Sequence, residues 1–374
     1  MRKVFDETKI GSLTMANRLV RSATWEGMCD QDGRPSGRLA AYYANLAAGG
    51  VGLIITGYSF IRPDGKQLPG QMGIHSDEFE KELKALTNGV HDRGGKICLQ
   101  AVHCGGQTTS RYAGSLPLAP SSLATAQYPE VPVQLSSEEI KLLVRQFGES
   151  ARRAREAGFD AVQIHAAHGY LINQFLSPLT NRRVDDYGGS PGNRCRFLLE
   201  VYHCVRSEVG SDFPVLVKLN GSDKLEGGFD LEGALYAARA LDEEGIDAIE
   251  VSAGTPASGN LSPVRQSIEA SDQEAYNLSL AAGIKKAVTC PILSVGGFRT
   301  YEIIEGVIRR GEVDYIALSR PFIREPHLVR RWQEGKEARA RCISCNGCFK
   351  PGLKEGGIYC VVDRIEEESK GISV

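Results

Sequence analysis

Short runs of β-branched and aliphatic residues alternate along the chain with longer stretches in which apolar residues recur at helical spacing. Short apolar runs bounded by turn signals are typical of buried strands, and their alternation with amphipathic stretches predicts repeated βα units around a parallel sheet. Eight such units predict a closed (β/α)8 barrel, the TIM-barrel architecture of the α/β class. The predicted strands are residues 18–23, 51–56, 96–101, 160–165, 214–219, 247–252, 291–296 and 314–319.

Glycine follows several of the predicted helices, directly before the next strand. The segments AAGG before residue 51, DRGG before 96, REAGF before 160 and DEEGI before 247 share this feature. Glycine adopts the left-handed conformation that ends a helix without steric cost, so each segment predicts a helix end.

Two long segments depart from the regular repeat. Residues 106–137 follow the third predicted strand, and residues 253–275 follow the sixth. Both leave the carboxyl ends of strands, where barrel enzymes carry their active sites, so we expect them to act as lids. We expect two parts of the chain: residues 1–335 form the barrel, and residues 336–374 form a cysteine-rich extension packed on it.

The charge and hydropathy of the chain exclude some classes of partner. It has 374 residues, with 44 basic and 46 acidic side chains and a formal net charge of −2. That balance predicts no nucleic-acid partner and no binding to a membrane surface. Charged residues interrupt the first twenty positions, which therefore lack the apolar core of a signal peptide. We expect a cytoplasmic protein.

Four of the ten cysteines lie close together near the end of the sequence. In a reducing compartment cysteines are more often ligands or core residues than disulfides. The spacing is C-x2-C-x2-C-x11-C, which suits a 4Fe–4S cluster because such clusters take four cysteine ligands. A zinc site and an unoccupied motif are the alternatives. The four residues are Cys342, Cys345, Cys348 and Cys360.

A pair of histidines marks the carboxyl end of the fourth predicted strand. His165 and His168 are three residues apart, so both imidazoles can face one cavity. Two neutral imidazole N–H groups can donate hydrogen bonds to one carbonyl oxygen and stabilise the enolate formed when hydride arrives. Tyr170 is near enough to supply the balancing proton. A metal site or a hydrogen-bonded pair in the core is the alternative for these two histidines alone.

The stretch IHAAHGYLINQFLSPLTNRRVDDYGGSPGNRCRFLLE, residues 164–200, resembles the Old Yellow Enzyme family of flavin oxidoreductases. The resemblance is to the branch of 2,4-dienoyl-CoA reductase and trimethylamine dehydrogenase, and it extends from FDETKIGSLTMANR to the last cysteines. It implies an FMN-dependent enzyme with an N-terminal hairpin. It also implies that the histidine pair holds the carbonyl of an α,β-unsaturated substrate and that Tyr170 donates the proton.

The resemblance also implies how the isoalloxazine ring of FMN is held. Gln100 ends the third predicted strand, and its amide can both donate to and accept from the pyrimidine edge, as the matching family glutamine does. Lys218, on the fifth strand, matches a basic residue beside the flavin, where positive charge favours the anionic reduced form. We expect backbone contacts from Ala23, Thr24 and Gly57.

The phosphate of FMN is expected at the seventh and eighth predicted strands. Gly296 and Gly297 expose backbone N–H groups near a helix N-terminus, and Arg320 adds a guanidinium group. Trp25 stands where trimethylamine dehydrogenase attaches its flavin through a cysteine, so we expect non-covalent FMN.

The larger relatives continue into a region that binds FAD and a pyridine nucleotide, whereas this sequence ends at residue 374 without a strand–GxGxxG–helix unit. We therefore expect electrons from NAD(P)H directly, or from a separate electron-transfer protein through the cluster. The substrate is expected to be a small molecule, and a homo-oligomer is left open. Two alternatives to C=C reduction remain: an amine or N-methyl dehydrogenase that passes electrons outward, and an electron-transfer subunit.

Overall fold

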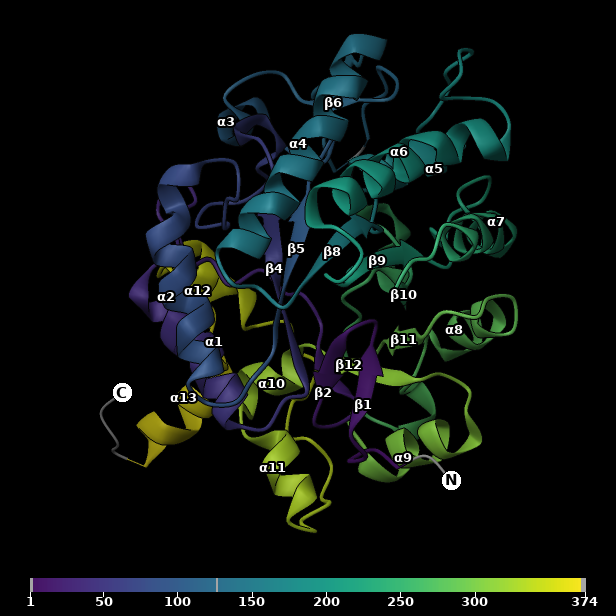
Figure 1. The fold of residues 1–374 in the computed structure, drawn as a ribbon. Coiled ribbons are helices and arrows are strands. Elements are labelled where there is room, and N and C mark those ends of the chain that lie inside the picture. Colours follow the sequence, from purple (N-terminus) through teal and green to yellow (C-terminus); the bar gives the residue numbers. More distant parts are fainter. Residues whose placement is uncertain (1–2, 126, 371–374) are drawn as a thin grey trace.

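The computed structural model describes residues 3–125 and 127–370, and in them parallel strands close into one barrel (Figure 1). Each of the eight predicted runs overlaps one barrel strand, which confirms the predicted fold class. The barrel strands are β3 (Leu19–Arg21), β4 (Leu53–Phe60), β5 (Ile97–Val102), β8 (Ala161–Ala166), β9 (Val215–Asn220), β10 (Ala248–Ser252), β11 (Ile292–Val295) and β12 (Tyr315–Leu318).

Helices follow the strands and cover the outside of the barrel (Figure 1). Polar side chains start several of them: Ser136 accepts a hydrogen bond from the backbone N–H of Glu139, and Asp230 accepts one from Gly233. The predicted glycine ends are confirmed, for example at Gly158, where φ is +85°. The helices that follow the barrel strands are α1 (Gly37–Ala48), α2 (Glu80–His91), α4 (Ser137–Glu156), α5 (Leu171–Leu176), α6 (Pro191–Val209), α7 (Leu231–Glu243), α8 (Leu278–Lys285), α9 (Tyr301–Arg310) and α10 (Arg320–Arg324).

An antiparallel hairpin of β1 (Thr8–Ile10) and β2 (Leu13–Met15) precedes the barrel, as predicted. Its buried side chains Ile10, Leu13 and Met15 belong to one apolar cluster with residues inside the barrel. The cluster includes Leu53 and Leu216, near the starts of their strands. The hairpin therefore packs on the N-terminal end of the barrel and leaves the carboxyl ends of the strands for the active site.

The two long segments and the C-terminal part carry short elements of their own. Residues 106–137 contain α3 (Ser110–Ala113) and the paired strands β6 (Leu118–Ala119) and β7 (Val133–Gln134). The short 3-10 helices are η1 (Pro63–Gly65), η2 (Asp77–Phe79), η3 (Pro256–Leu261) and η4 (Ser271–Gln273). The last helices are α11 (Leu328–Gln333), α12 (Phe349–Lys354) and α13 (Val361–Ser369).

The C-terminal segment packs on the barrel. Arg324 of α10 forms an ion pair with Asp363 of α13 at 2.9 Å, and the backbone N–H of Ile358 donates to the carbonyl of Glu26. The division of the chain at residue 336 remains a prediction. Among the described residues, none of the helices combines the length and the apolar character needed to cross a membrane.

Candidate active site

A cavity of about 350 Å³ lies at the carboxyl ends of the barrel strands. Strand ends far apart in the sequence supply its wall, because the barrel brings all carboxyl ends to one face. The wall includes all but one of the side chains predicted for catalysis and FMN binding. These are Ala23, Thr24, Gln100, His165, His168, Tyr170, Lys218, Gly296, Gly297 and Arg320.

Gly57 is the predicted residue that is not part of this wall. Its backbone N–H donates to the carboxylate of Glu26 at 3.1 Å and to the hydroxyl of Tyr43 at 3.0 Å. Glu26 also accepts from the buried guanidinium group of Arg21. Gly57 therefore takes part in a buried polar cluster behind the wall, and its contact with FMN remains a prediction.

The histidine pair faces the cavity from the end of β8. The rings of His165 and His168 have centroids 5.1 Å apart and are tilted by 79°. His165 Nδ1 accepts a hydrogen bond from the backbone N–H of Ala167 at 3.2 Å. A neutral imidazole whose Nδ1 accepts carries its proton on Nε2. His165 thus presents an Nε2–H donor.

The backbone of His168 is held in a strained conformation. Its φ is +63°, in the left-handed region that residues with a Cβ rarely adopt and that is often found at functional sites. Asn220 accepts from its backbone N–H at 3.2 Å, and the side-chain amide of Gln107 donates to its carbonyl at 2.7 Å. The Nε2 atom of His168 lies 2.7 Å from the hydroxyl of Ser252 on β10. Three side chains therefore fix this histidine.

Both imidazoles are neutral at physiological pH. Burial lowers the pKa of His165 well below its usual value, and His168 and the ammonium group of Lys218 lower it further. Burial and Lys218 likewise hold the pKa of His168 well below its usual value. Neutral imidazoles can each donate one hydrogen bond to a ligand oxygen without carrying a buried charge.

Tyr170 lies beside the pair, with its ring centroid 4.8 Å from that of His165. Its hydroxyl donates to the side-chain oxygen of Gln67 at 2.8 Å. Burial raises the pKa of Tyr170 well above its usual value, so the phenol keeps its proton at neutral pH. The predicted proton donor is therefore protonated and adjacent to the histidines.

A hydrogen-bonded chain of buried side chains links Gln100 and Lys218 of the cavity wall. Gln100 donates to Gln163 at 2.6 Å, Gln163 donates to Glu250 at 2.9 Å, and Glu250 pairs with Lys218 at 3.1 Å. Ser22 donates to Glu250 at 2.5 Å and accepts from Lys218 at 2.8 Å. Lys218 thus has the partner that a buried cation needs, and its charge is balanced locally.

Sequence reasoning missed Gln163, Glu250 and Ser252, although a signal for them exists. Gln163 stands two positions before His165, and Glu250 stands two positions before Ser252. Residues two apart on a strand share a face, so a polar side chain two positions before an inward-facing one also points into the barrel.

The amide of Gln100 fits the pyrimidine edge of a flavin. The side chain is completely buried, its Nε2 donates to Gln163, and its oxygen has no hydrogen-bond partner within the described chain. A buried polar atom without a partner is costly, so this oxygen is poised to accept from a ligand N–H.

The other end of the cavity fits a phosphate group. Gly296 and Gly297 follow β11, and the guanidinium groups of Arg299 and Arg320 lie on the same wall. Burial lowers the pKa of Arg299, and the charge of Arg320 lowers it as well. Two neighbouring cations beside glycine backbone are typical of an anion site. Arg299 was missed, although it follows the glycine pair by two residues in the sequence.

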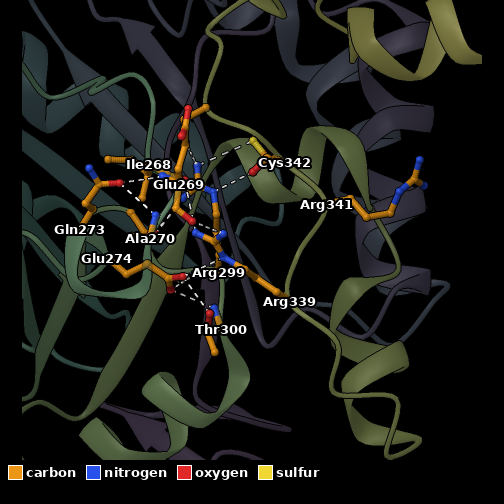
Figure 2. A network of polar contacts seen from close by, with 12 residues as sticks. Ile268, Glu269, Ala270, Gln273, Glu274, Arg299, Thr300, Arg339, Arg341 and Cys342 are labelled. Atoms are coloured by element: carbon orange, nitrogen blue, oxygen red, sulfur yellow. Dashed lines mark hydrogen bonds and ion pairs between the residues drawn. The ribbon is translucent and has the colours of Figure 1, made fainter.

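The loop after β10 helps to hold this end in place. The completely buried side chain of Glu274 accepts hydrogen bonds from the backbone N–H groups of Arg299 and Thr300 at 2.7 and 2.9 Å (Figure 2). It also pairs with Arg339 at 3.0 Å, and Arg299 donates to the carbonyl of Cys342 at 2.8 Å (Figure 2). One carboxylate thus joins the loop, the expected phosphate segment and the C-terminal segment.

The C-terminal segment also contributes to the cavity itself. Phe349 and Leu353 of α12 line it together with Trp25. The indole N–H of Trp25 donates to the carbonyl of Pro69 at 3.1 Å. Aromatic and aliphatic side chains of the C-terminal segment therefore form part of the cavity wall.

The four clustered cysteines surround a separate cavity of about 20 Å³, which holds about one water molecule. Within residues 3–125 and 127–370, no group of three or more His, Cys, Asp or Glu side chains is placed to hold a metal ion. Burial raises the pKa of the Cys348 thiol to about 12. As placed, these residues do not fit an iron–sulfur cluster, and the predicted cluster is not supported.

Comparison with known proteins agrees with the site. The NADH:flavin oxidoreductase / NADH oxidase family model matches residues 3–339. An NADH oxidase of Thermoanaerobacter brockii is 38% identical over 92% of this chain and 53% of its own length. An Old Yellow Enzyme homologue from Zymomonas mobilis superimposes with a TM-score of 0.79 at 31% identity, over 89% of this chain and 93% of its own.

A 2-naphthoyl-CoA reductase in complex with 2-naphthoyl-CoA superimposes with a TM-score of 0.89 at 28% identity, over 96% of this chain and 56% of its own. The chain thus spans about half the length of that reductase and of the NADH oxidase. The match over nearly the whole chain confirms the predicted resemblance to the Old Yellow Enzymes, and the chain belongs to the NADH:flavin oxidoreductase / NADH oxidase family.

Proposed function

We propose that this chain is an FMN-dependent oxidoreductase that reduces the C=C bond of an α,β-unsaturated carbonyl compound. The observation that carries the proposal is the pair of neutral imidazoles beside a protonated phenol at the carboxyl end of the barrel. The two imidazoles can donate hydrogen bonds to a carbonyl oxygen, and the phenol can donate a proton to the carbon next to that carbonyl.

His165 and His168 bind the carbonyl oxygen of the substrate. His165 donates through Nε2, because Nδ1 already accepts from Ala167. When the Ser252 hydroxyl donates to Nε2 of His168, the remaining proton of that ring lies on Nδ1 and is directed to the ligand. Two donors held in place before the reaction stabilise the negative charge that develops on the oxygen, as in an oxyanion hole.

Tyr170 protonates the α-carbon. The O–H bond of the phenol breaks, the electron pair of the enolate forms the new C–H bond, and the carbonyl is restored. A buried phenol with a raised pKa is a weak acid, so it gives up its proton only to a strongly basic carbon such as that of an enolate.

FMN, when bound, would supply the hydride that adds to the β-carbon, with NADH or NADPH as the reductant. Gln100 would hold its pyrimidine edge, and Gly296, Gly297 and Arg320 would hold its phosphate. Trp25 has no nucleophile to offer, so the cofactor is held non-covalently. The pairing of Lys218 with Glu250 makes the field beside the ring weaker than a lone lysine would give.

The relatives support the choice of reductant and substrate class. The matched family and its Thermoanaerobacter member are named for NADH, and the 2-naphthoyl-CoA reductase is named for a conjugated thioester.

Amine oxidation is the second candidate, because aromatic rings surround part of the cavity. The rings of Tyr58 and Tyr170 have centroids 5.4 Å apart, and Trp25 and Tyr276 line the same wall. Aromatic faces attract methylated ammonium groups. The neutral histidine pair, which suits a carbonyl oxygen, makes this the weaker candidate.

The test is to purify the protein without oxygen, record its visible spectrum, and assay acid-released flavin, iron and sulfide. Turnover of NADH and of NADPH with 2-cyclohexenone is then compared with turnover of trimethylamine and an artificial electron acceptor. The proposal predicts one FMN per chain and turnover of the enone. A protein without bound flavin, or one that turns over only the amine, would refute it.

A further inference from the structure

Gln67 lies at the centre of three tyrosine hydroxyls, and the proposed function gives it no task. Its side-chain oxygen accepts from Tyr170 at 2.8 Å and from Tyr58 at 2.9 Å. Its Nε2 donates to the hydroxyl of Tyr128 at 2.7 Å. The side chain is buried and lines the active-site cavity.

These groups come from four separate parts of the chain. Tyr58 lies on β4, Gln67 follows η1, Tyr128 lies in the long segment after β5, and Tyr170 directly precedes α5. The fold therefore brings the predicted lid segment into hydrogen-bond contact with the wall around the proton donor.

The position of Gln67 is fixed from behind. Its backbone N–H donates to the side-chain oxygen of Gln71 at 2.8 Å, and the amide of Gln71 donates to the carbonyl of Tyr58 at 3.0 Å. Gln71 is also buried. An amide held through its backbone and its Nε2 presents its oxygen in one direction, toward the two phenols.

The shared acceptor has a chemical consequence for Tyr170. Each phenol has one proton, and in this arrangement both protons point to the same oxygen. Once Tyr170 gives its proton to a substrate carbon, its oxygen carries a negative charge in a buried place, which is costly without a donor. Burial raises the pKa of Tyr170 well above its usual value, so the phenolate form is costly here.

We propose that Gln67 and Tyr58 are positioning residues for proton transfer from Tyr170, with Tyr128 holding the amide of Gln67 in place. Gln67 orients the Tyr170 hydroxyl until the substrate displaces it. Tyr58 then turns its O–H from Gln67 to the Tyr170 phenolate, and solvent water returns the lost proton to Tyr170. This inference rests on the proposed function, in which Tyr170 is the acid.

The test uses the FMN-loaded protein and the variants Gln67→Leu, Tyr58→Phe and Tyr128→Phe. Tyr112→Phe is the matched control, because Tyr112 lies in α3 of the same long segment and contacts the side chain of Arg111. The single-turnover formation of cyclohexanone from 2-cyclohexenone is measured in H2O and D2O as a function of pH. The rate of flavin reduction by NADH or NADPH is measured separately.

Gln67→Leu and Tyr58→Phe are expected to slow product formation by roughly tenfold and to increase its solvent isotope effect, since general acids contribute about 10²–10⁴ in rate. Tyr128→Phe is expected to have a smaller effect in the same direction. Flavin reduction in each variant, and both rates in Tyr112→Phe, are expected to stay within about twofold of the wild type.

Equal losses in flavin reduction and product formation would show a merely structural role and overturn the inference. An unchanged rate and isotope effect in Gln67→Leu would also overturn it. Tyr170→Phe separates this from a failure of the proposed function: if that variant forms cyclohexanone at the wild-type rate, Tyr170 is not the acid. If Tyr170→Phe is slow and Gln67→Leu is not, only the positioning role fails.

Discussion

The buried pair of Lys218 and Glu250 offers a sharp test of how the buried polar chain beside the cavity is stabilised. Both side chains are at most 3% exposed and lie 3.1 Å apart. In Glu250→Gln the size is kept but the negative charge is lost, so Lys218 retains a buried charge without a counter-ion. The amide can also place an N–H group against Lys218 or Ser22, which both donate to the carboxylate in the native protein.

Removal of one partner of a buried ion pair typically costs about 3–5 kcal/mol. We expect a loss in this range for Glu250→Gln, a large part of the roughly 5–15 kcal/mol that stabilises a typical folded protein. The double variant Lys218→Met with Glu250→Gln removes both charges. It should be more stable than Glu250→Gln alone by about 0.5–3 kcal/mol, the usual range of coupling energies between contacting residues.

The assay is urea unfolding of the FMN-free protein, because bound FMN would add its own binding energy to the measured stability. Glu80→Gln is the control: Glu80 pairs with Lys84 on the surface, where both side chains are about half exposed, and it should cost less than about 0.5 kcal/mol. A cost below about 1 kcal/mol for Glu250→Gln, or a double variant no more stable than the single one, would refute the reasoning.

Three further predictions concern the site. Ser252→Ala removes the hydrogen-bond partner of His168 and should slow enone reduction by about tenfold, the value of one hydrogen bond. Flavin reduction by NADH should stay unchanged, and equal losses in the two rates would contradict the prediction. Arg320→Met should weaken FMN binding by roughly 10–100-fold in a fluorescence titration. The affinity for riboflavin, which lacks the phosphate, should stay within about threefold of the wild-type value. Equal weakening of both affinities would place the phosphate elsewhere. His165 is neutral when folded but binds a proton below about pH 6.5 when unfolded, so this one residue should lower the unfolding free energy by up to about 1.4 kcal/mol per pH unit below that pH. Urea unfolding from pH 7.5 to 5 should show a shallower fall for His165→Asn than for the exposed control His203→Asn, and identical slopes would contradict it.

Most of the fold was accessible from the sequence because the barrel repeats one simple pattern. Each strand is a short apolar run, and residues such as Gly158 and Gly245 mark the helix ends with positive φ. The hairpin was implied by family resemblance alone, since its two three-residue strands carry little periodic signal.

Site residues at the end of a strand could be predicted from the sequence. Residues whose role depends on contacts with other side chains were harder to predict. His165 and Gln100 were found because a polar side chain at the end of an apolar strand stands out. Gln67 lies in an irregular segment after η1, and nothing local indicates that Tyr128, distant in sequence, accepts a hydrogen bond from it. Such contacts depend on tertiary structure.

The cysteine segment shows the limit of spacing as a signal. The C-x2-C-x2-C-x11-C pattern gathers Cys342, Cys345, Cys348 and Cys360 around one small cavity, which agrees with a shared role. Ligand geometry also depends on side-chain directions and on the space between the sulfurs, which spacing does not determine. The iron and sulfide assay described above decides this prediction.

The most direct test of the proposed role of His165 and His168, which is to bind the carbonyl oxygen of the substrate, is a single turnover under anaerobic conditions. The protein is reduced with one equivalent of NADH or NADPH and mixed with 2-cyclohexenone, and the return of the oxidised flavin absorbance is followed. The double variant His165→Ala with His168→Ala should reoxidise at least about 10²–10³-fold more slowly than the wild type, the effect of removing oxyanion donors, whereas His203→Asn should be unaffected. Reoxidation of the double variant at the wild-type rate would contradict the central claim that these histidines activate the substrate.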